Sequence, residues 1–534
     1  MGAIISAAAF ELAKMANGGN FNEVSLTNRI RLTTPEQAQV ILDLTKEALK
    51  TDATDQLSKT VTVSTGLTAY NLRSPSLLFS PTITPIRNSL KRTQLANPGP
   101  AANWKYINGL SNTPNFMGWV PEGRRSGSIT YSATPASAAY ATMGTEDSVT
   151  DEAKFAAVGF EDEEALIQLR SLYKLMQIEE NSLLWGNASS SLAQPATPVL
   201  AAAGSSATLP AATYSVIVVP LTGMGYQHAS LTGGVLLPQS ITSNDGNGSY
   251  TLNGGSGPKS SAATQAITLG QALNCTVTPV SGAVAYAWYV GTAGSETLQA
   301  ITTINSASFS VPLVGSRQAA SAITADWSTN ATGYDGLITQ AFKNASLAYI
   351  NTLSTGGAGA GTQMTAVGDG EIKEIRDMLK GMWDTYKISV TALYVSSQEL
   401  TSITKLVLAG GSAPLVRLNT TATGGAPADV RYTAGAVVGW YFNPYTADGG
   451  KFIPILLHPN MTPGTIFGYA EVLPATYMSN ETPTVAELLI RQDYYVEKWP
   501  KVSRTQFYGT YCQSVPAVYA PFCLAVITNI APTL

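Results

Sequence analysis

The chain has 534 residues and a formal net charge of −4, and only 12% of its residues are charged against 45% that are hydrophobic. This length exceeds the size at which a single hydrophobic core stops growing, so several domains are expected. Scattered Lys and Arg in a net negative chain exclude a dedicated clamp for nucleic-acid phosphates. No stretch of about 18 uncharged apolar residues is present, which excludes a membrane-spanning helix. The low charge therefore favours a surface that lies largely against other protein subunits.

The sequence lacks the motifs that catalysis or metal binding needs. Cys275, Cys512 and Cys523 have no C-x-x-C spacing, so we expect reduced thiols and neither a disulfide framework nor a zinc site. His228 and His458 are the two histidines and have no metal-ligand spacing, and there is no G-x-S-x-G elbow. The stretch GGAGAG is not followed by the Lys-Ser/Thr of a phosphate loop. We expect a protein that is not an enzyme and has no cofactor, with His458 a turn residue after a strand.

Residues 1–72 predict an extended arm that carries one helix. The first residues, MGAIISAAAFELAK, lack the positively charged region of a signal peptide, so no export signal is expected. In TPEQAQVILDLTKEALKT, Thr34 is placed as an N-cap and Pro35 at the first helical position. The residues that follow are too polar to form a core alone.

Residues 73–102 are punctuated by proline and begin the compact part of the chain. Residues 103–150 then alternate polar and small residues and predict a long two-stranded hairpin. Such a hairpin has too little apolar content to be stable alone in water, so we expect it to lie on a partner. Trp104 and Trp119 are its candidate anchors, and packing against the chain's own body is the alternative.

Residues 151–189 contain the strongest predicted helix. The acidic run from Glu161 to Glu164 favours a helix N-terminus, because carboxylates complement the exposed amide groups there. Leu169, Tyr173 and Met176 belong to one apolar stripe with the helical period, and Arg170 falls on the remaining surface. The pair Gly186–Asn187 ends the helix.

Residues 190–325 form an almost uncharged block. Six short stretches, TYSVIVVPLT, SYTLNGG, QALNCTVTPV, AVAYAWYVG, ETLQAITTI and ASFSVPLV, read as strands between Gly, Ser and Asn turns. Alternation in AVAYAWYVG predicts a half-buried strand, with Tyr286 and Trp288 on one face, Ala287 and Tyr289 on the other, and Trp288 in the core. The block therefore predicts an inserted β-sandwich of immunoglobulin-like type.

The remaining segments, 326–365, 366–490 and 491–534, change to an α/β pattern. DGEIKEIRDMLKGMWDTYK and SQELTSITKLVL predict helices, and SVTALYVSS, AGAVVGWYF, FIPILLHP and GTIFGYAEVL predict buried strands. A glycine-rich loop, TTATGGAPADVRYTAG, interrupts them. The last sixty residues are mostly β and return to the main body.

The order of these elements, with the phrases MGWVPEG and GYDGLITQ, resembles the major capsid proteins of tailed bacteriophages, the HK-ninety-seven-like fold. The resemblance implies an α+β fold with an N-terminal arm (1–72), an extended loop (103–150) and a spine helix (151–189). The spine helix belongs to a peripheral domain that also takes residues 73–102, 326–365 and 491–534. Residues 366–490 hold a peripheral helix and the axial domain, and the all-β immunoglobulin-like sandwich (190–325) is an insertion into this pattern.

The resemblance also implies a function: a capsid subunit that assembles into the pentamers and hexamers of an icosahedral shell around double-stranded DNA. The expected location is the virion, after assembly in the host cytoplasm. Expected partners are further copies of the chain, a portal, decoration or scaffolding proteins, and DNA enclosed without sequence-specific binding; no membrane is expected. Candidate contacts between subunits are Trp104, Trp119, Glu122, Arg124, Arg125, Glu161, Glu163 and Arg170.

Two alternatives remain open from the sequence. An exported surface-layer or adhesive protein would also carry an immunoglobulin-like module. An enzyme with a carbohydrate-binding β insert would need a cleft with paired carboxylates whose pKa values are shifted.

Overall fold

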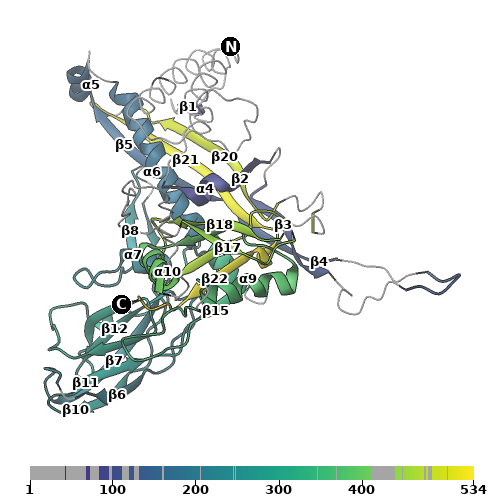
Figure 1. The fold of residues 1–534 in the computed structure, drawn as a ribbon. Helices are drawn as coiled ribbons and strands as arrows, with labels where there is room; N and C mark the ends of the chain where they lie inside the picture. Colours follow the sequence, from purple (N-terminus) through teal and green to yellow (C-terminus); the bar gives the residue numbers. More distant parts are fainter. Residues whose placement is uncertain are drawn as a thin grey trace, which may run out of the picture.

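The fold is described from a computed structural model (Figure 1). It describes residues 43, 68–71, 83–95, 99–110, 119–125, 131–158, 162–204, 206–244, 246, 248–344, 347–367, 370–409, 439–447, 449–473, 477–478, 484–501 and 503–533. Most of the expected arm, its predicted helix after Thr34 except Asp43, and the glycine-rich loop at 420–435 lie outside the described residues.

One long helix lies across a five-stranded sheet in the upper part of the body (Figure 1). The strands run in the order β1 (Thr68–Asn71), β20 (Ala486–Lys498), β21 (Thr505–Val518) and β5 (Ala141–Thr150), and β2 (Lys91–Gln94) pairs with β20 in parallel. Helix α6 (Glu163–Trp185) packs on this sheet. Leu172, Leu175 and Met176 of α6 share a buried core with Tyr494 and Tyr508 of the sheet.

The helix expected within 151–189 is two helices. Helix α5 (Asp151–Ala157) is capped by the Thr150 hydroxyl, which accepts a hydrogen bond from the Ala153 amide. A second cap at Asp162, whose carboxylate accepts from the Glu164 and Ala165 amides, begins α6 anew. Two N-cap signals within twelve residues therefore divide the segment. The predicted end is confirmed, because α6 stops at Gly186.

The hairpin expected over 103–150 is shorter than predicted. Strand β3 (Ala101–Leu110) pairs antiparallel with β4 (Tyr131–Ala139), and the pair projects from the body. Strand β5 instead pairs with β21 in the five-stranded sheet, so it leaves the hairpin. Its end residues Ala141 and Val149 are buried, and that burial explains why β5 joins the body.

A second, six-stranded sheet forms the centre of the body. Its order is β15 (Tyr349–Thr352), β22 (Leu524–Thr528), β19 (Ile466–Tyr469), β16 (Ala392–Val395), β18 (Lys451–Leu457) and β17 (Trp440–Asn443). Helices α8 (Leu337–Lys343), α9 (Lys373–Tyr386) and α10 (Ser397–Ala409) accompany it. The last strand, β22, was expected to join the other C-terminal strands. Every residue of β22 is buried, and a central position between β15 and β19 provides that burial.

The uncharged block folds as a separate β module at the lower end of Figure 1. One sheet has the order β10 (Ala263–Ile267), β7 (Ala212–Leu221), β12 (Ala285–Gly291) and β13 (Thr297–Thr302). The other has the order β14 (Ser306–Phe309), β11 (Ala272–Thr276) and β6 (Val199–Ala203). Trp288, fully buried, lies in the core that both sheets share, as predicted. A hairpin of β8 (Gln239–Thr242) and β9 (Ser249–Leu252) and the short helix α7 (Gly223–His228) complete the module.

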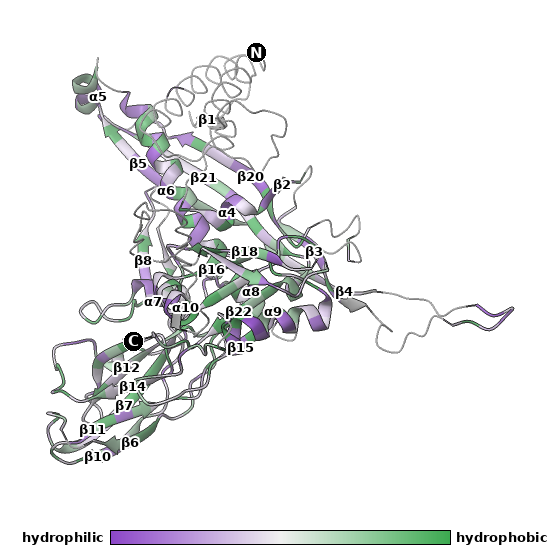
Figure 2. Cartoon of the chain, in the orientation of Figure 1, coloured by the Kyte–Doolittle hydropathy of each residue, from purple (hydrophilic) through white to green (hydrophobic). Residues whose placement is uncertain are grey.

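Strand β12 is buried on both faces, so the prediction of a half-buried strand is wrong. The predicted faces are correct: Tyr286 and Trp288 point into the shared core, whereas Ala287 and Tyr289 point away from it. The second face is covered by a further cluster that includes Ile323 and the partly buried Trp327. Figure 2 shows hydrophobic residues concentrated in the strands of both the body and the module.

The module leaves the body and returns to it at one point. The Gly336 amide donates to the Gly186 carbonyl at 2.8 Å, and the Asn330 amide donates to the Asn187 carbonyl at 2.8 Å. The Asp335 carboxylate then accepts hydrogen bonds from the next backbone amides of the departing chain. A side chain at Gly336 has no room, because a Cβ there would lie 2.7 Å from the Ser182 carbonyl oxygen.

We predict that Gly336→Ala lowers the free energy of unfolding by about 1–3 kcal/mol, since the added methyl group must push backbone apart. Gly333→Ala is the matched control, because its nearest atom would be 3.4 Å away. Differential scanning calorimetry of the two variants measures the difference. Equal unfolding temperatures would contradict the tight junction.

Candidate assembly surfaces

A buried cluster of charges fixes the long helix to strands far away in sequence. The Glu179 carboxylate on α6 accepts from Arg87 Nε at 3.0 Å and from Arg92 Nη1 at 2.9 Å. Arg92 Nη2 also donates to Asp493 at 2.9 Å, and the Tyr494 hydroxyl donates to Glu179. Burial by itself lowers the pKa of Arg92, but the combined attraction to Glu179, Asp493 and other neighbouring groups outweighs it and raises that pKa. The cluster is therefore a paired, structural one.

The neighbouring Glu180 holds two further segments. Its carboxylate accepts from the Ile86 and Arg87 amides at 2.9 and 2.6 Å, at the start of helix α4 (Pro85–Ser89). It also binds His458 Nε2 at 2.7 Å. Because His458 Nδ1 accepts from the Asn460 amide, Nε2 carries the hydrogen. His458 directly follows β18, as predicted.

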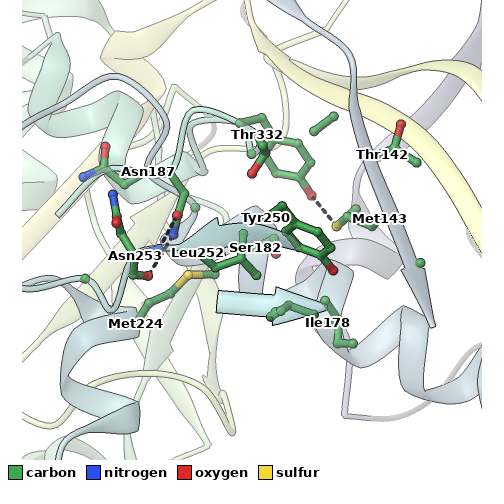
Figure 3. Close-up of a pocket in the computed structure, with 18 of the residues that line it drawn as sticks. Thr142, Met143, Ile178, Ser182, Asn187, Met224, Tyr250, Leu252, Asn253 and Thr332 are labelled. Carbon is green, nitrogen blue, oxygen red and sulfur yellow. Dashed lines mark hydrogen bonds between the residues drawn. The ribbon is translucent and has the colours of Figure 1, made fainter. Parts of the chain in front are cut away.

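A cleft of about 1000 Å³ lies between the module and the body (Figure 3). On its wall the Asn330 side chain accepts from the Asn253 amide and donates to the Asn253 carbonyl, and the Tyr334 hydroxyl is directed at the Met143 sulfur. Glu146 is the single charged residue among those lining the cleft. The Tyr511 hydroxyl donates to Glu146 on the cleft wall, but the lining residues include no second carboxylate, so the cleft lacks the carboxylate pair that the enzyme alternative requires.

Neither a metal-ligand cluster nor a membrane-spanning helix is found among the described residues. They contain no group of three or more His, Cys, Asp or Glu side chains arranged to hold a metal ion. In the same part of the chain, no helix combines the length and the apolar character needed to cross a membrane.

The structure separates the two predicted tryptophan anchors. Trp104 on β3 donates its indole hydrogen to the Val518 carbonyl at 3.2 Å and packs against the body's core. Its alternative role, packing within its own chain, is the observed one. Trp119, in contrast, is 90% exposed, in the segment 119–125 that lies apart from the body (Figure 1). Its neighbours Glu122, Arg124 and Arg125 are exposed as well.

The other predicted contact residues lie on α6, away from that loop. Glu163 is the first residue of α6 and is half-buried, and Arg170 is exposed on the same helix. Glu161 lies outside the described residues. The structure does not bring these residues together with residues 119–125 in one molecule (Figure 1).

Helix α5 is an exposed surface that sequence reasoning missed. None of its seven residues is buried, and Phe155 is 78% exposed. Val158, the residue that ends α5, is 72% exposed. The Asp151 amide donates to the Arg504 carbonyl at 2.9 Å and the Asp151 carboxylate pairs with Lys501, so the start of the helix is fixed on the body; Glu152 and Arg504 form a further, solvent-exposed pair. The sequence does contain a signal for this surface: Phe155 and Val158 are three residues apart, which is the spacing of one helix face.

A third exposed apolar surface lies at the edge of the six-stranded sheet. Trp440 and Phe442 on β17 are 62% and 46% exposed, and Phe452 on β18 is 68% exposed. The rings of Phe442 and Phe452 have centroids 5.3 Å apart. Contiguous exposed aromatic residues of this kind mark contact sites.

No protein-family model and no curated protein matches this chain. Similar solved structures include the capsid of a native GTA particle, at 8% identity over 84% of this chain and 91% of that chain, with a TM-score of 0.34. Another is the encapsulin complex of Synechococcus elongatus, at 10% identity over 90% and 96%, with a TM-score of 0.35. A third is the capsid of Myoviridae phage XM1, at 10% identity over 84% and 92%, with a TM-score of 0.32.

These similar structures are a phage capsid, a GTA particle capsid and an encapsulin. Scores of 0.32–0.35 do not by themselves establish a shared fold.

We predict that Glu179→Gln lowers the free energy of unfolding by roughly 3–5 kcal/mol, because it leaves buried guanidinium groups with too little opposite charge. Glu152→Gln is the matched control: it breaks an ion pair on the surface, where such pairs contribute little. Chemical denaturation of the two variants measures the difference. A loss of similar size in both would show that the buried cluster has no special role.

Proposed function

We propose that this chain is the repeating subunit of a closed protein shell, of the kind that encloses double-stranded DNA in tailed bacteriophages. One observation carries the proposal: the chain exposes large apolar side chains on a projecting loop that its own body does not cover. Trp119 is 90% exposed there, and such a residue is expected to be buried by a partner.

The exposed surfaces face different directions, which supports a many-sided assembly. Residues 119–125 project on one side, α5 lies at the opposite upper end, and β17 lies in the central sheet (Figure 1). A subunit with several separate contact surfaces forms rings or shells through repeated contacts, whereas one self-complementary patch gives a dimer. The net charge of −4 suits a container that encloses DNA without gripping its phosphates.

The β module, on the same proposal, is an immunoglobulin-like sandwich that decorates the shell. Two features support this. First, strands β6, β7, β10, β11, β12 and β13 pair in the manner of immunoglobulin strands B, C, C′, E, F and G. Second, Tyr286 stands near the start of β12, and its hydroxyl accepts a hydrogen bond from the Val280 amide at 2.9 Å. This is the arrangement of a tyrosine corner. One departure is that β14, the last strand of the module, occupies the edge beside β11.

Electron microscopy of the purified chain tests the shell. We expect closed particles, or rings of five and six subunits, because further copies of the chain bury the exposed surfaces. Flat sheets would indicate a surface layer instead, and monomers at all concentrations would refute the proposal. Nuclease protection of DNA in particles from expressing cells tests enclosure, with emptied particles as the control.

We predict that replacing residues 190–325 by a short Gly-Ser linker leaves shell assembly intact. The segments on either side already meet, since the Asn330 amide binds the Asn187 carbonyl. Electron microscopy is expected to show particles of unchanged shell diameter without the peripheral density. Loss of all particles, in a variant whose body still melts cooperatively, would mean that the module takes part in assembly.

A further inference from the structure

The cleft between the module and the body is lined by aromatic rings and neutral polar groups. Its volume of about 1000 Å³ lies at the upper end of the range of ligand-binding pockets. The aromatic residues on its walls are Tyr140, Trp185, Tyr250, Tyr334 and Tyr511. The described lining residues also include Asn, Ser and Thr side chains but no Lys, Arg or His, and anionic ligands are bound chiefly by such cations. The composition therefore favours a neutral ligand.

The ring of Tyr511 lies flat across two strands because the positions beneath it are glycines. A Cβ at Gly144 on β5 would lie 2.1 Å from one edge of the ring, and a Cβ at Gly509 on β21 would lie 2.5 Å from the other. The Tyr511 hydroxyl donates to the Glu146 carboxylate, to which Asn244 Nδ2 also donates at 2.9 Å. The ring is therefore held in place before a ligand binds.

Tyr250 provides a second ring from the module side of the cleft. It belongs to β9, is 50% exposed and points into the cleft (Figure 3). A flat apolar ring face suits the C–H face of a sugar, whereas the hydroxyl groups of the sugar need hydrogen-bond partners. Two such rings on one cleft therefore favour a ligand that has both apolar faces and hydroxyl groups.

Two tyrosine hydroxyl groups of the cleft have unused hydrogen-bonding capacity. Tyr334 is only 3% exposed, and its hydroxyl meets the Met143 sulfur at 3.9 Å, which is a weak acceptor. The buried Tyr140 hydroxyl has no hydrogen-bond partner in the part of the chain that the structure describes. Burial raises the pKa of both residues, so each hydroxyl keeps its hydrogen. Because buried polar groups are normally paired, a polar ligand would supply what these two lack.

We propose that this cleft binds a neutral oligosaccharide. The rings of Tyr511 and Tyr250 pack against the apolar faces of sugar rings. The hydroxyls of Tyr334 and Tyr140 donate to sugar oxygens, and the remaining lone pairs of the Glu146 carboxylate accept from sugar hydroxyl groups. The site lies within one chain, so the inference goes beyond the shell proposed above and does not rest on it.

Calorimetric titration of the full chain tests the site. The probes are linear oligosaccharides of glucose, mannose, galactose and N-acetylglucosamine, each at millimolar concentration. We expect at least one to bind, with an affinity that does not change when NaCl is raised from about 0.05 M to about 0.5 M, because no ionic attraction to the ligand is involved.

Tyr250→Ala is expected to weaken this binding by about tenfold or more, since it removes an aromatic anchor. The residue is half exposed, so the substitution leaves the fold intact. Leu269→Ala is the matched control, because Leu269 is an 80% exposed residue of the module outside the cleft lining. The control is expected to bind like the unmodified chain.

Gly144→Ala tests the fixed ring, because the new methyl group displaces Tyr511. We expect a loss of binding of about tenfold or more, as for Tyr250→Ala. Gly333→Ala is the control on the same cleft: its Cβ would meet only the Asn330 carbonyl oxygen, at 3.4 Å, and binding is expected to stay unchanged. Cooperative thermal unfolding of each variant shows that it is folded, and Tyr250→Ala decides the matter if Gly144→Ala is not.

Three results would overturn the proposal. The first is that none of the neutral oligosaccharides binds, and the second is binding that survives Tyr250→Ala. The third is binding of oligolysine alone, abolished by high salt and by Glu146→Gln, which would identify a basic peptide as the occupant instead. Electron microscopy of the same preparation reports on the shell separately, so failure of one proposal is distinguishable from failure of the other.

Discussion

The two adjacent carboxylates of Glu179 and Glu180 on α6 are the interaction on which the body depends. Residues one position apart on a helix point in different directions, so this pair reaches two sets of partners. Glu179 binds Arg87 and Arg92, and Glu180 binds the start of α4 and His458. Full burial makes these contacts costly to break singly, because each charge has been removed from water. The helix is thereby fixed to both sheets, and the outward surfaces of the body are held in defined directions.

Because the buried charges fix the elements of the body, the surfaces that the body leaves uncovered are held in place. The stem of the hairpin rests on the body through Trp104, while Trp119 at its end has no cover. Helix α5 is held by ion pairs and buries none of its own residues. Both features leave apolar area exposed to water in a single molecule, and further copies would bury that area. This is the basis of the proposal of a repeating subunit.

Local patterns predicted the elements whose signals are strong. Alternation around Trp288 predicted the two faces of β12, and the pattern of DGEIKEIRDMLKGMWDTYK predicted helix α9. Elements with weak local patterns, and elements placed by partners distant in sequence, were not predicted correctly. Strand β6, VLAAA, has small residues and little alternation, and the placement of β5 and β22 depends on partners distant in sequence. In the candidate site, no local pattern distinguishes Trp104 from Trp119, because the partner of Trp104 is Val518.

The junction at Gly186 and Gly336 has a consequence for protein engineering. Where the chain crosses between body and module, the departing and returning segments are joined by a 2.8 Å backbone hydrogen bond. Any folded domain whose own ends lie close together meets the same geometric requirement, and most domains have such ends. The site is therefore suited to grafting of foreign cargo, and a closed particle would present that cargo as a regular, multivalent array.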